Sequence, residues 1–129
     1  MLTRLGLLAL APMRTVAAHV ARDMFPRPEQ EEIYRAVVES LSRNAKAPYT
    51  AALLALVRFD ARAELGRVRC PTLIVAGERD VTVPMSAKQR LGHEISSARL
   101  LPVPDSGHAT NIDQAEVFNR AVLEFITQH

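Results

Sequence analysis

An apolar run rich in β-branched residues, residues 72–76, is the feature that most constrains the fold of this chain. A continuous run of this kind is typical of a strand that is buried on both faces. A helical segment (84–93), a second apolar run (98–103) and a further helical segment (111–128) follow it. This order predicts two parallel strands joined by a right-handed crossover. We therefore assign the second half of the chain to the α/β class.

An acidic residue and a histidine lie just beyond the two predicted strands. Asp80 ends the sequence GERD after the first run, and His108 ends the sequence SGH after the second. Because open α/β sheets form their sites at the carboxyl ends of the strands, we expect these side chains to meet. An acid that orients a histidine makes up two-thirds of a nucleophilic triad. Taken singly, Asp80 is more typical of a turn after a strand than of a catalytic acid, and His108 fits a surface loop. We assign the neighbouring Asp105 to the turn.

Residues 1–65 have the periodicity of helices and carry no run that would complete the sheet. We predict helices over residues 2–11, 13–24 and 49–59, a helix that begins at Pro28, and a short turn capped by Asp60. The chain thus divides into a helical, cap-like segment, residues 1–65, and an α/β segment, residues 66–129. Because two strands alone leave open edges, we expect another chain or a second copy to cover them.

Composition and charge exclude several classes of protein. The formal net charge is only +2, and basic and acidic residues are interspersed. This pattern does not predict the positively charged surface with which proteins bind nucleic acid. No segment approaches the ~20 apolar residues that cross a membrane. The four histidines show no spacing typical of metal ligands. Cys70 is the single cysteine, so no internal disulfide forms. We predict that its side chain is buried as a small apolar group. We also expect a cytoplasmic protein.

Three motifs in the second half resemble the α/β-hydrolase fold superfamily, in particular its esterase, lactonase and cofactor-free haloperoxidase-like members. Residues 71–84 match the pattern Pro-x-Leu-x-x-x-Gly-x-x-Asp-x-x-x-Pro, which in that superfamily covers the seventh strand and the turn after it. Residues 104–108 resemble the loop after the eighth strand, and residues 117–126 the closing helix. Residues 1–65 are similar, through less specific motifs, to the helical cap that precedes the seventh strand.

The resemblance implies a partial α/β-hydrolase fold and a serine-type hydrolase of a small-molecule ester or lactone. It implies that Asp80 is the acid of the triad. It implies that His108 is the base, which takes the proton of a serine and returns it to the leaving group. It implies no cofactor.

The chain departs from the superfamily's pattern at the nucleophile. The family carries its serine in a Gly-x-Ser-x-Gly elbow, and none of the five glycines of this chain takes part in such a motif. Ser86 and Ser106 lie near the expected loops, but neither is on a strand-to-helix elbow. The chain thus resembles the C-terminal half of a hydrolase, and we expect it to be inactive or incomplete on its own.

A non-catalytic role is the alternative. As an interaction module or subunit, the chain would pair the exposed sheet edge at residues 72–76 with a partner or with itself. The expected macromolecular partners are therefore an N-terminal fragment that completes the enzyme, or a second copy in a homo-oligomer.

Overall fold

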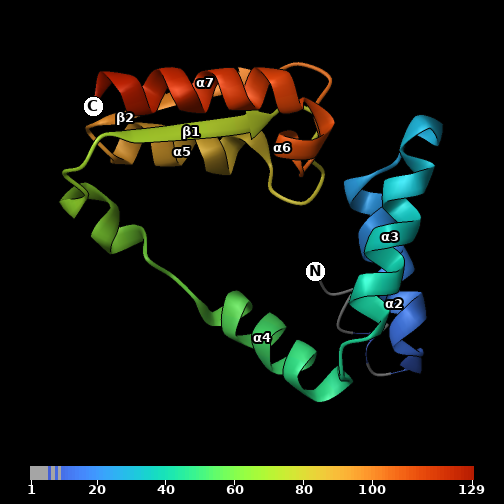
Figure 1. The fold of residues 1–129 in the computed structure, drawn as a ribbon. Coiled ribbons are helices and arrows are strands. Elements are labelled where there is room, and N and C mark those ends of the chain that lie inside the picture. The colour runs from blue at the N-terminus through green and yellow to red at the C-terminus, as the bar shows by residue number, and fades with distance from the viewer. Residues whose placement is uncertain (1–5, 7, 9) are drawn as a thin grey trace. The chain divides into compact units, whose positions relative to one another are not determined.

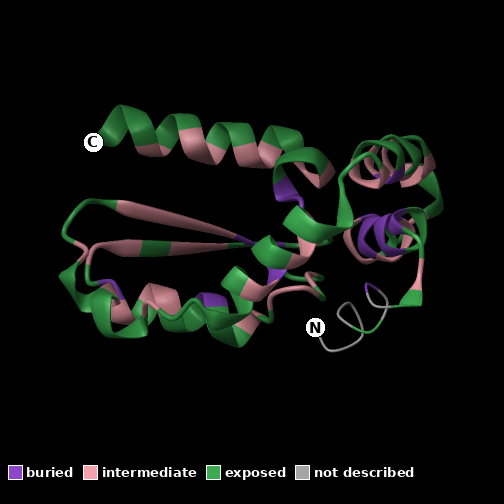
Figure 2. Cartoon of the chain, turned by 90° about the horizontal axis from the view of Figure 1, so that it is seen from below, coloured by how far each residue is buried: buried purple, intermediate pink, exposed green. Residues whose placement is uncertain are grey.

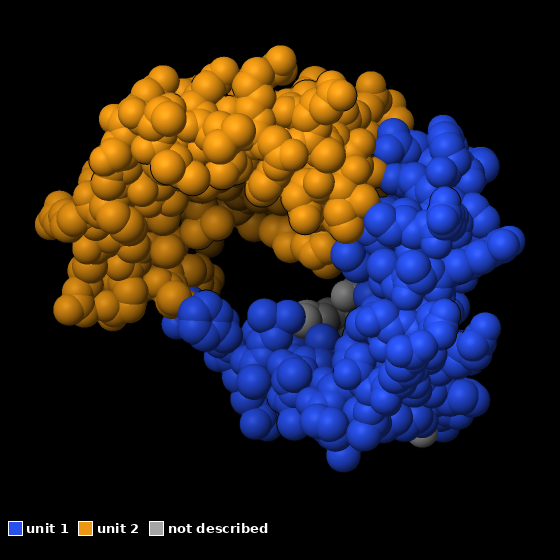
Figure 3. Space-filling model, viewed as in Figure 1, with its two compact units in different colours: residues 1–60 blue, residues 61–129 orange. Residues whose placement is uncertain are grey.

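The structure, a computed structural model, describes residue 6, residue 8 and residues 10–129 (Figure 1). The chain divides into two compact units, residues 1–60 and 61–129, which Figure 3 colours separately. The boundary predicted from the sequence lies slightly later, after residue 65. The helix predicted over residues 2–11 falls largely outside the described residues. No helix of the described part is long and apolar enough to span a bilayer.

Unit 1 is helical. Its helix α2 (Met13–Met24) has the predicted bounds, and the 3-10 helix η1 (Pro28–Gln30) leads into α3 (Glu31–Ser42), so helical structure begins at Pro28 as predicted. α2 packs against α3. The buried side of α2 consists of Met13, Val16, Ala17, Val20 and Ala21. Burial of this apolar stripe is what stabilises a helix of this length.

Helix α4 (Lys46–Arg58), also in unit 1, begins earlier than the predicted start at residue 49. It includes Pro48 in its first turn. A proline is tolerated there because the first N–H groups of a helix have no intrahelical acceptor. Leu53 is its one buried residue and belongs to the same apolar cluster as Val16 and Val20 of α2.

Unit 2 is α/β, as predicted, with two parallel strands. The strands β1 (Thr72–Gly77) and β2 (Ala98–Val103) pair along their whole length. Helix α5 (Met85–Glu94) connects them and packs on both. Figures 1 and 2 show α5 on one face of the sheet and α7 (Ala115–Gln128) on the other. This arrangement gives the sheet its two covered faces.

The sheet of unit 2 is less deeply buried than the sequence predicts. Leu73, Ile74 and Val75 are only half-buried although helices lie on both faces. The physical reason is the narrowness of the sheet, because no further strand of the described residues pairs with β1 or β2. Burial is greater toward the carboxyl ends of the strands, at Ala76 and Val103.

The helix predicted over residues 111–128 is two helices, α6 (Thr110–Asp113) and α7. Gln114 separates them with a non-helical backbone (φ −134°, ψ 53°). The Asp113 carboxylate accepts a hydrogen bond from the Gly107 N–H at 2.5 Å, which ties α6 to the loop after β2. Ile126 of α7 is exposed, because the two strands cover only part of this helix.

Two predictions for the start of unit 2 are wrong. Ala61, not Asp60, is the residue that precedes the 3-10 helix η2 (Arg62–Arg67). Cys70 is exposed rather than buried, because the strand begins only at Thr72 and the preceding turn lies outside the covered part of the sheet.

Candidate functional site

Asp80 and His108 lie at the carboxyl ends of the two strands. Asp80 is in the loop between β1 and α5, and His108 is in the loop between β2 and α6. Because the strands are parallel, both loops leave the same end of the sheet. His108 Nδ1 is 3.0 Å from Asp80 Oδ2, so the contact expected from the sequence is present. In the tautomer that carries its proton on Nδ1, the imidazole donates to the carboxylate and leaves Nε2 as an acceptor.

Backbone hydrogen bonds hold the two loops together. The Glu78 N–H donates to the Val103 carbonyl at 3.1 Å, and the Arg79 N–H donates to the Ser106 carbonyl at 2.8 Å. These bonds continue the strand pairing beyond the last residues of β1 and β2. The relative position of Asp80 and His108 is therefore set by the main chain as well as by their own contact.

The Asp80 carboxylate makes four polar contacts, two with backbone N–H groups and two with charged or ionisable side chains. Its Oδ1 accepts from the backbone N–H groups of Thr82 at 2.7 Å and Val83 at 3.0 Å. Its Oδ2 contacts Lys88 Nζ at 2.8 Å in addition to His108. The Asp80 side chain is only 4% exposed. A carboxylate has about four acceptor positions, so this buried group is fully satisfied.

Opposing effects act on the pKa of the Asp80 carboxyl. Burial raises this pKa because it disfavours the charged form, but Lys88, His108 and the N–H groups of Val83 and Thr82 lower it more. The net result is a pKa well below the usual range of an aspartate. Asp80 is therefore a permanent carboxylate at any pH near neutrality.

This depressed pKa predicts an acid-dependent stability. A carboxyl whose pKa is lower in the folded state contributes stability above its unfolded pKa of about 4, and that contribution is lost as the pH falls further. We expect the free energy of unfolding, measured with urea, to decline as the pH falls below about 4. The Asp80→Asn variant is expected to show a shallower decline. Equal declines in the parent and the variant would contradict a special role of this carboxylate.

Lys88 is part of the site although it is not among the residues predicted from the sequence. This residue lies in the middle of α5, and its side chain is 10% exposed. The structure places Lys88 one helical turn before Gly92, where a β-carbon would contact Leu100 and Ile74 of the sheet, and no sequence pattern marks this side of α5. A lysine on the sheet-facing side of a helix is costly unless an acidic group meets it. That group is Asp80.

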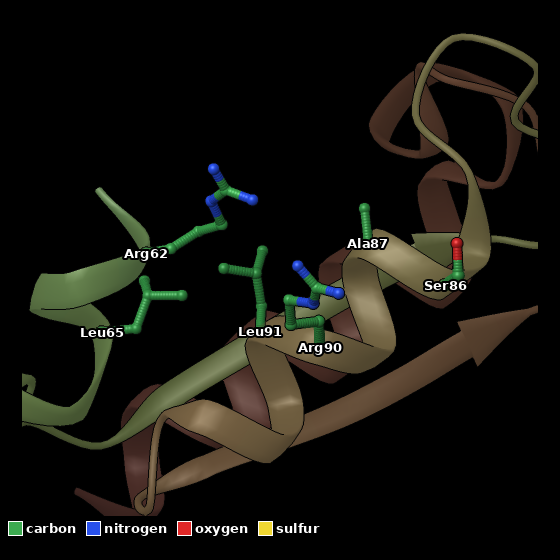
Figure 4. A pocket seen from close by; sticks show the side chains of 6 residues that line it. All are labelled: Arg62, Leu65, Ser86, Ala87, Arg90 and Leu91. Carbon is green, nitrogen blue, oxygen red and sulfur yellow. The ribbon is translucent and has the colours of Figure 1, made fainter. Parts of the chain in front are cut away.

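The two serines considered from the sequence are not joined to His108. Ser106 is fully buried, and its hydroxyl donates to Thr110 Oγ1 at 3.0 Å. Ser86 lines a separate pocket of about 410 Å³, together with Arg62, Leu65, Ala87, Arg90 and Leu91 (Figure 4). Neither Asp80 nor His108 lines that pocket. Among the described residues, no serine hydroxyl is hydrogen-bonded to the imidazole.

Asp105 has the turn role expected of it. Its φ of 57° lies in the left-handed region, which aspartate tolerates better than most residues. Its carboxylate pairs with the guanidinium of Arg79, and both side chains are largely exposed. Over the described ranges, no group of three or more histidine, cysteine or acidic side chains is arranged to hold a metal ion.

Comparison with known proteins relates the chain to hydrolases. RutD of Variovorax paradoxus, a provisionally named carbamate hydrolase, is 39% identical over 74 residues, which are 57% of this chain and 28% of RutD. The pimeloyl-acyl-carrier-protein methyl ester esterase of Chromobacterium violaceum is 29% identical over 114 residues, which are 88% of this chain and 45% of the esterase. The chain therefore spans less than half the length of these relatives.

Solved structures show the same fold. The enol-lactonase from Burkholderia xenovorans has a TM-score of 0.88 at 22% identity, over 98% of this chain and 49% of the lactonase. A hydrolase from Pseudomonas aeruginosa has a TM-score of 0.85 at 26% identity, over 96% of this chain and 48% of that protein. The family model described as TAP-like protein matches residues 57–129, more than half of the chain. The chain belongs to this TAP-like protein family, within the α/β-hydrolase superfamily.

Proposed function

We propose that residues 1–129 form part of a serine-type hydrolase that cleaves a small-molecule ester, lactone or related acyl compound. The observation that carries this proposal is the contact between Asp80 Oδ2 and His108 Nδ1 at the carboxyl ends of two parallel strands. An ionised, buried acid that holds one nitrogen of an imidazole is the arrangement that activates a serine hydroxyl. The relatives named as an esterase and a carbamate hydrolase support an acyl substrate.

In this mechanism, Asp80 fixes the ring of His108 so that Nε2 faces the nucleophile. Nε2 takes the serine proton while the serine oxygen bonds to the carbonyl carbon. The bond to the leaving group then breaks, and the imidazolium returns its proton to that group. A water molecule repeats both steps on the acyl-enzyme: it gives its proton to Nε2, and the acid leaves as the serine is restored.

The nucleophile in this proposal comes from outside residues 1–129. Ser106 is buried and engaged by Thr110, and Ser86 lines another pocket. Within the described part of the chain, the outer edge of β1 pairs with no strand. An N-terminal hydrolase fragment that adds a strand there would bring its serine to the same end of the sheet. Self-association through the same edge is the non-catalytic alternative.

A complementation assay tests this function. The chain is refolded with the N-terminal part of the Pseudomonas aeruginosa hydrolase, and hydrolysis of p-nitrophenyl acetate is followed. We expect no turnover by either fragment alone, and turnover by the mixture, with the intact Pseudomonas hydrolase as the positive control. Light scattering on the same samples reports the association state. A stable homo-oligomer that gives no turnover in any mixture would contradict the proposal and favour the non-catalytic role.

A further inference from the structure

We propose that Lys88 is a positioning residue of this site. Its ammonium holds Oδ2 of Asp80 and the backbone carbonyl at the end of β1, so that the carboxylate meets His108 in one fixed orientation. This inference rests on the proposed function, because it assigns a role at the same acid–histidine pair.

The contacts of Lys88 join three segments of unit 2. Lys88 Nζ is 2.8 Å from Asp80 Oδ2 and donates to the Gly77 carbonyl at 3.1 Å. The ammonium thus connects α5 to the last residue of β1 and to the loop that carries Asp80. A lysine normally extends its ammonium into water, and a buried one is costly unless it is paired and hydrogen-bonded. Lys88 meets both conditions, which distinguishes it from the exposed cations of the same helix.

The orientation of the carboxylate follows from these contacts. The N–H groups of Thr82 and Val83 hold Oδ1 from one side. Lys88 occupies one acceptor direction of Oδ2 and leaves the other to His108. Rotation of the carboxylate would break contacts at both oxygens at once. The imidazole therefore meets an acceptor whose position is already determined by the fold.

Lys88 also supplies the countercharge of Asp80. Two ionisable side chains contact the carboxylate within the described residues, Lys88 from α5 and His108 from the loop before α6. The other charged side chains of these loops are exposed, namely Glu78, Arg79 and Asp105. An ammonium balances the carboxylate whatever the state of His108. Asp80 can therefore stay ionised while the imidazole is neutral, as the proposed mechanism requires before attack.

Carbon-13 NMR of the Asp80 carboxyl in this chain tests the inference. The variants are Lys88→Met, which keeps a long unbranched side chain but removes the ammonium group, and Lys88→Arg, which retains the charge. Arg90→Met is the matched control, because Arg90 is an exposed cation of the same helix. In Lys88→Met, we expect Asp80 to titrate at a pH higher by about one unit or more. In Lys88→Arg and Arg90→Met, we expect it to stay ionised to the lowest pH at which the chain is folded.

Two results would overturn the proposal. The first is an unchanged Asp80 titration in folded Lys88→Met. The second result concerns the parent chain and is needed if Lys88→Met does not fold. Because protons of a paired and buried ammonium exchange slowly with water, the parent should show a slowly exchanging ammonium signal for Lys88. The absence of this signal overturns the proposal. Neither result depends on ester hydrolysis. A chain that fails as a hydrolase but shows a Lys88-dependent Asp80 titration would refute only the proposed function.

Discussion

Replacement of His108 with alanine is expected to lower kcat/KM of the complemented enzyme by about ten-thousandfold or more, with little change in KM. Without the imidazole, no group of this chain takes the serine proton, and the carboxylate of Asp80 has nothing to orient. Asp80→Asn is expected to cause a loss of similar size, because an amide at this position no longer stabilises the imidazolium that forms during attack. The measurement is steady-state hydrolysis of p-nitrophenyl acetate.

The control for His108 is His93→Ala, which removes another exposed histidine of unit 2. It should leave kcat/KM unchanged. The double variant Asp80→Asn with His108→Ala should be scarcely less active than His108→Ala alone, since residues that act as one unit give non-additive losses. Parent-like activity of His108→Ala would refute the assignment of the base. An equal loss in His93→Ala would mean that folding, rather than proton transfer, had been changed.

Much of unit 2 could be predicted because its signals are local. The apolar runs at residues 72–76 and 98–103 have the length and composition typical of strands, and β2 has the predicted bounds. Once the strands are parallel, the topology alone brings Asp80 and His108 to one end of the sheet. The 3.0 Å contact between them is thus a consequence of strand order and loop position. Their catalytic roles stay predictions.

The features that the sequence did not reveal depend on contacts between distant segments. The burial of Lys88 requires the side chain of Asp80, and that pairing is formed only when α5 packs on the sheet. The break at Gln114 accompanies the hydrogen bond from Gly107 to Asp113, which no helical periodicity shows. The exposure of Cys70 depends on where the sheet ends. The periodicity of apolar residues describes one segment of the chain at a time, whereas each of these features depends on how two segments pack against each other.

Gly77→Ala is expected to destabilise unit 2 by about 3 kcal/mol or more. A β-carbon at this position would lie 2.6 Å from the Ser106 carbonyl oxygen and closer still to that of Gly107. Both are backbone atoms, so no side-chain rotation relieves the clash, and the loop that carries His108 must move away from β1. The Gly77 carbonyl is also the second acceptor of Lys88. The displacement therefore reaches the acid–histidine pair itself.

Urea denaturation of the variants, followed by circular dichroism, measures this effect. The control is Gly66→Ala in η2, where a β-carbon would meet no heavy atom within 4 Å. There we expect the free energy of unfolding to be unchanged or raised by up to about 1 kcal/mol, because alanine restricts the unfolded chain. A Gly77→Ala variant as stable as the parent would show that the two loops separate at little cost. In that case, the contact between Asp80 and His108 would not depend on the close approach of β1 to the loop that carries His108.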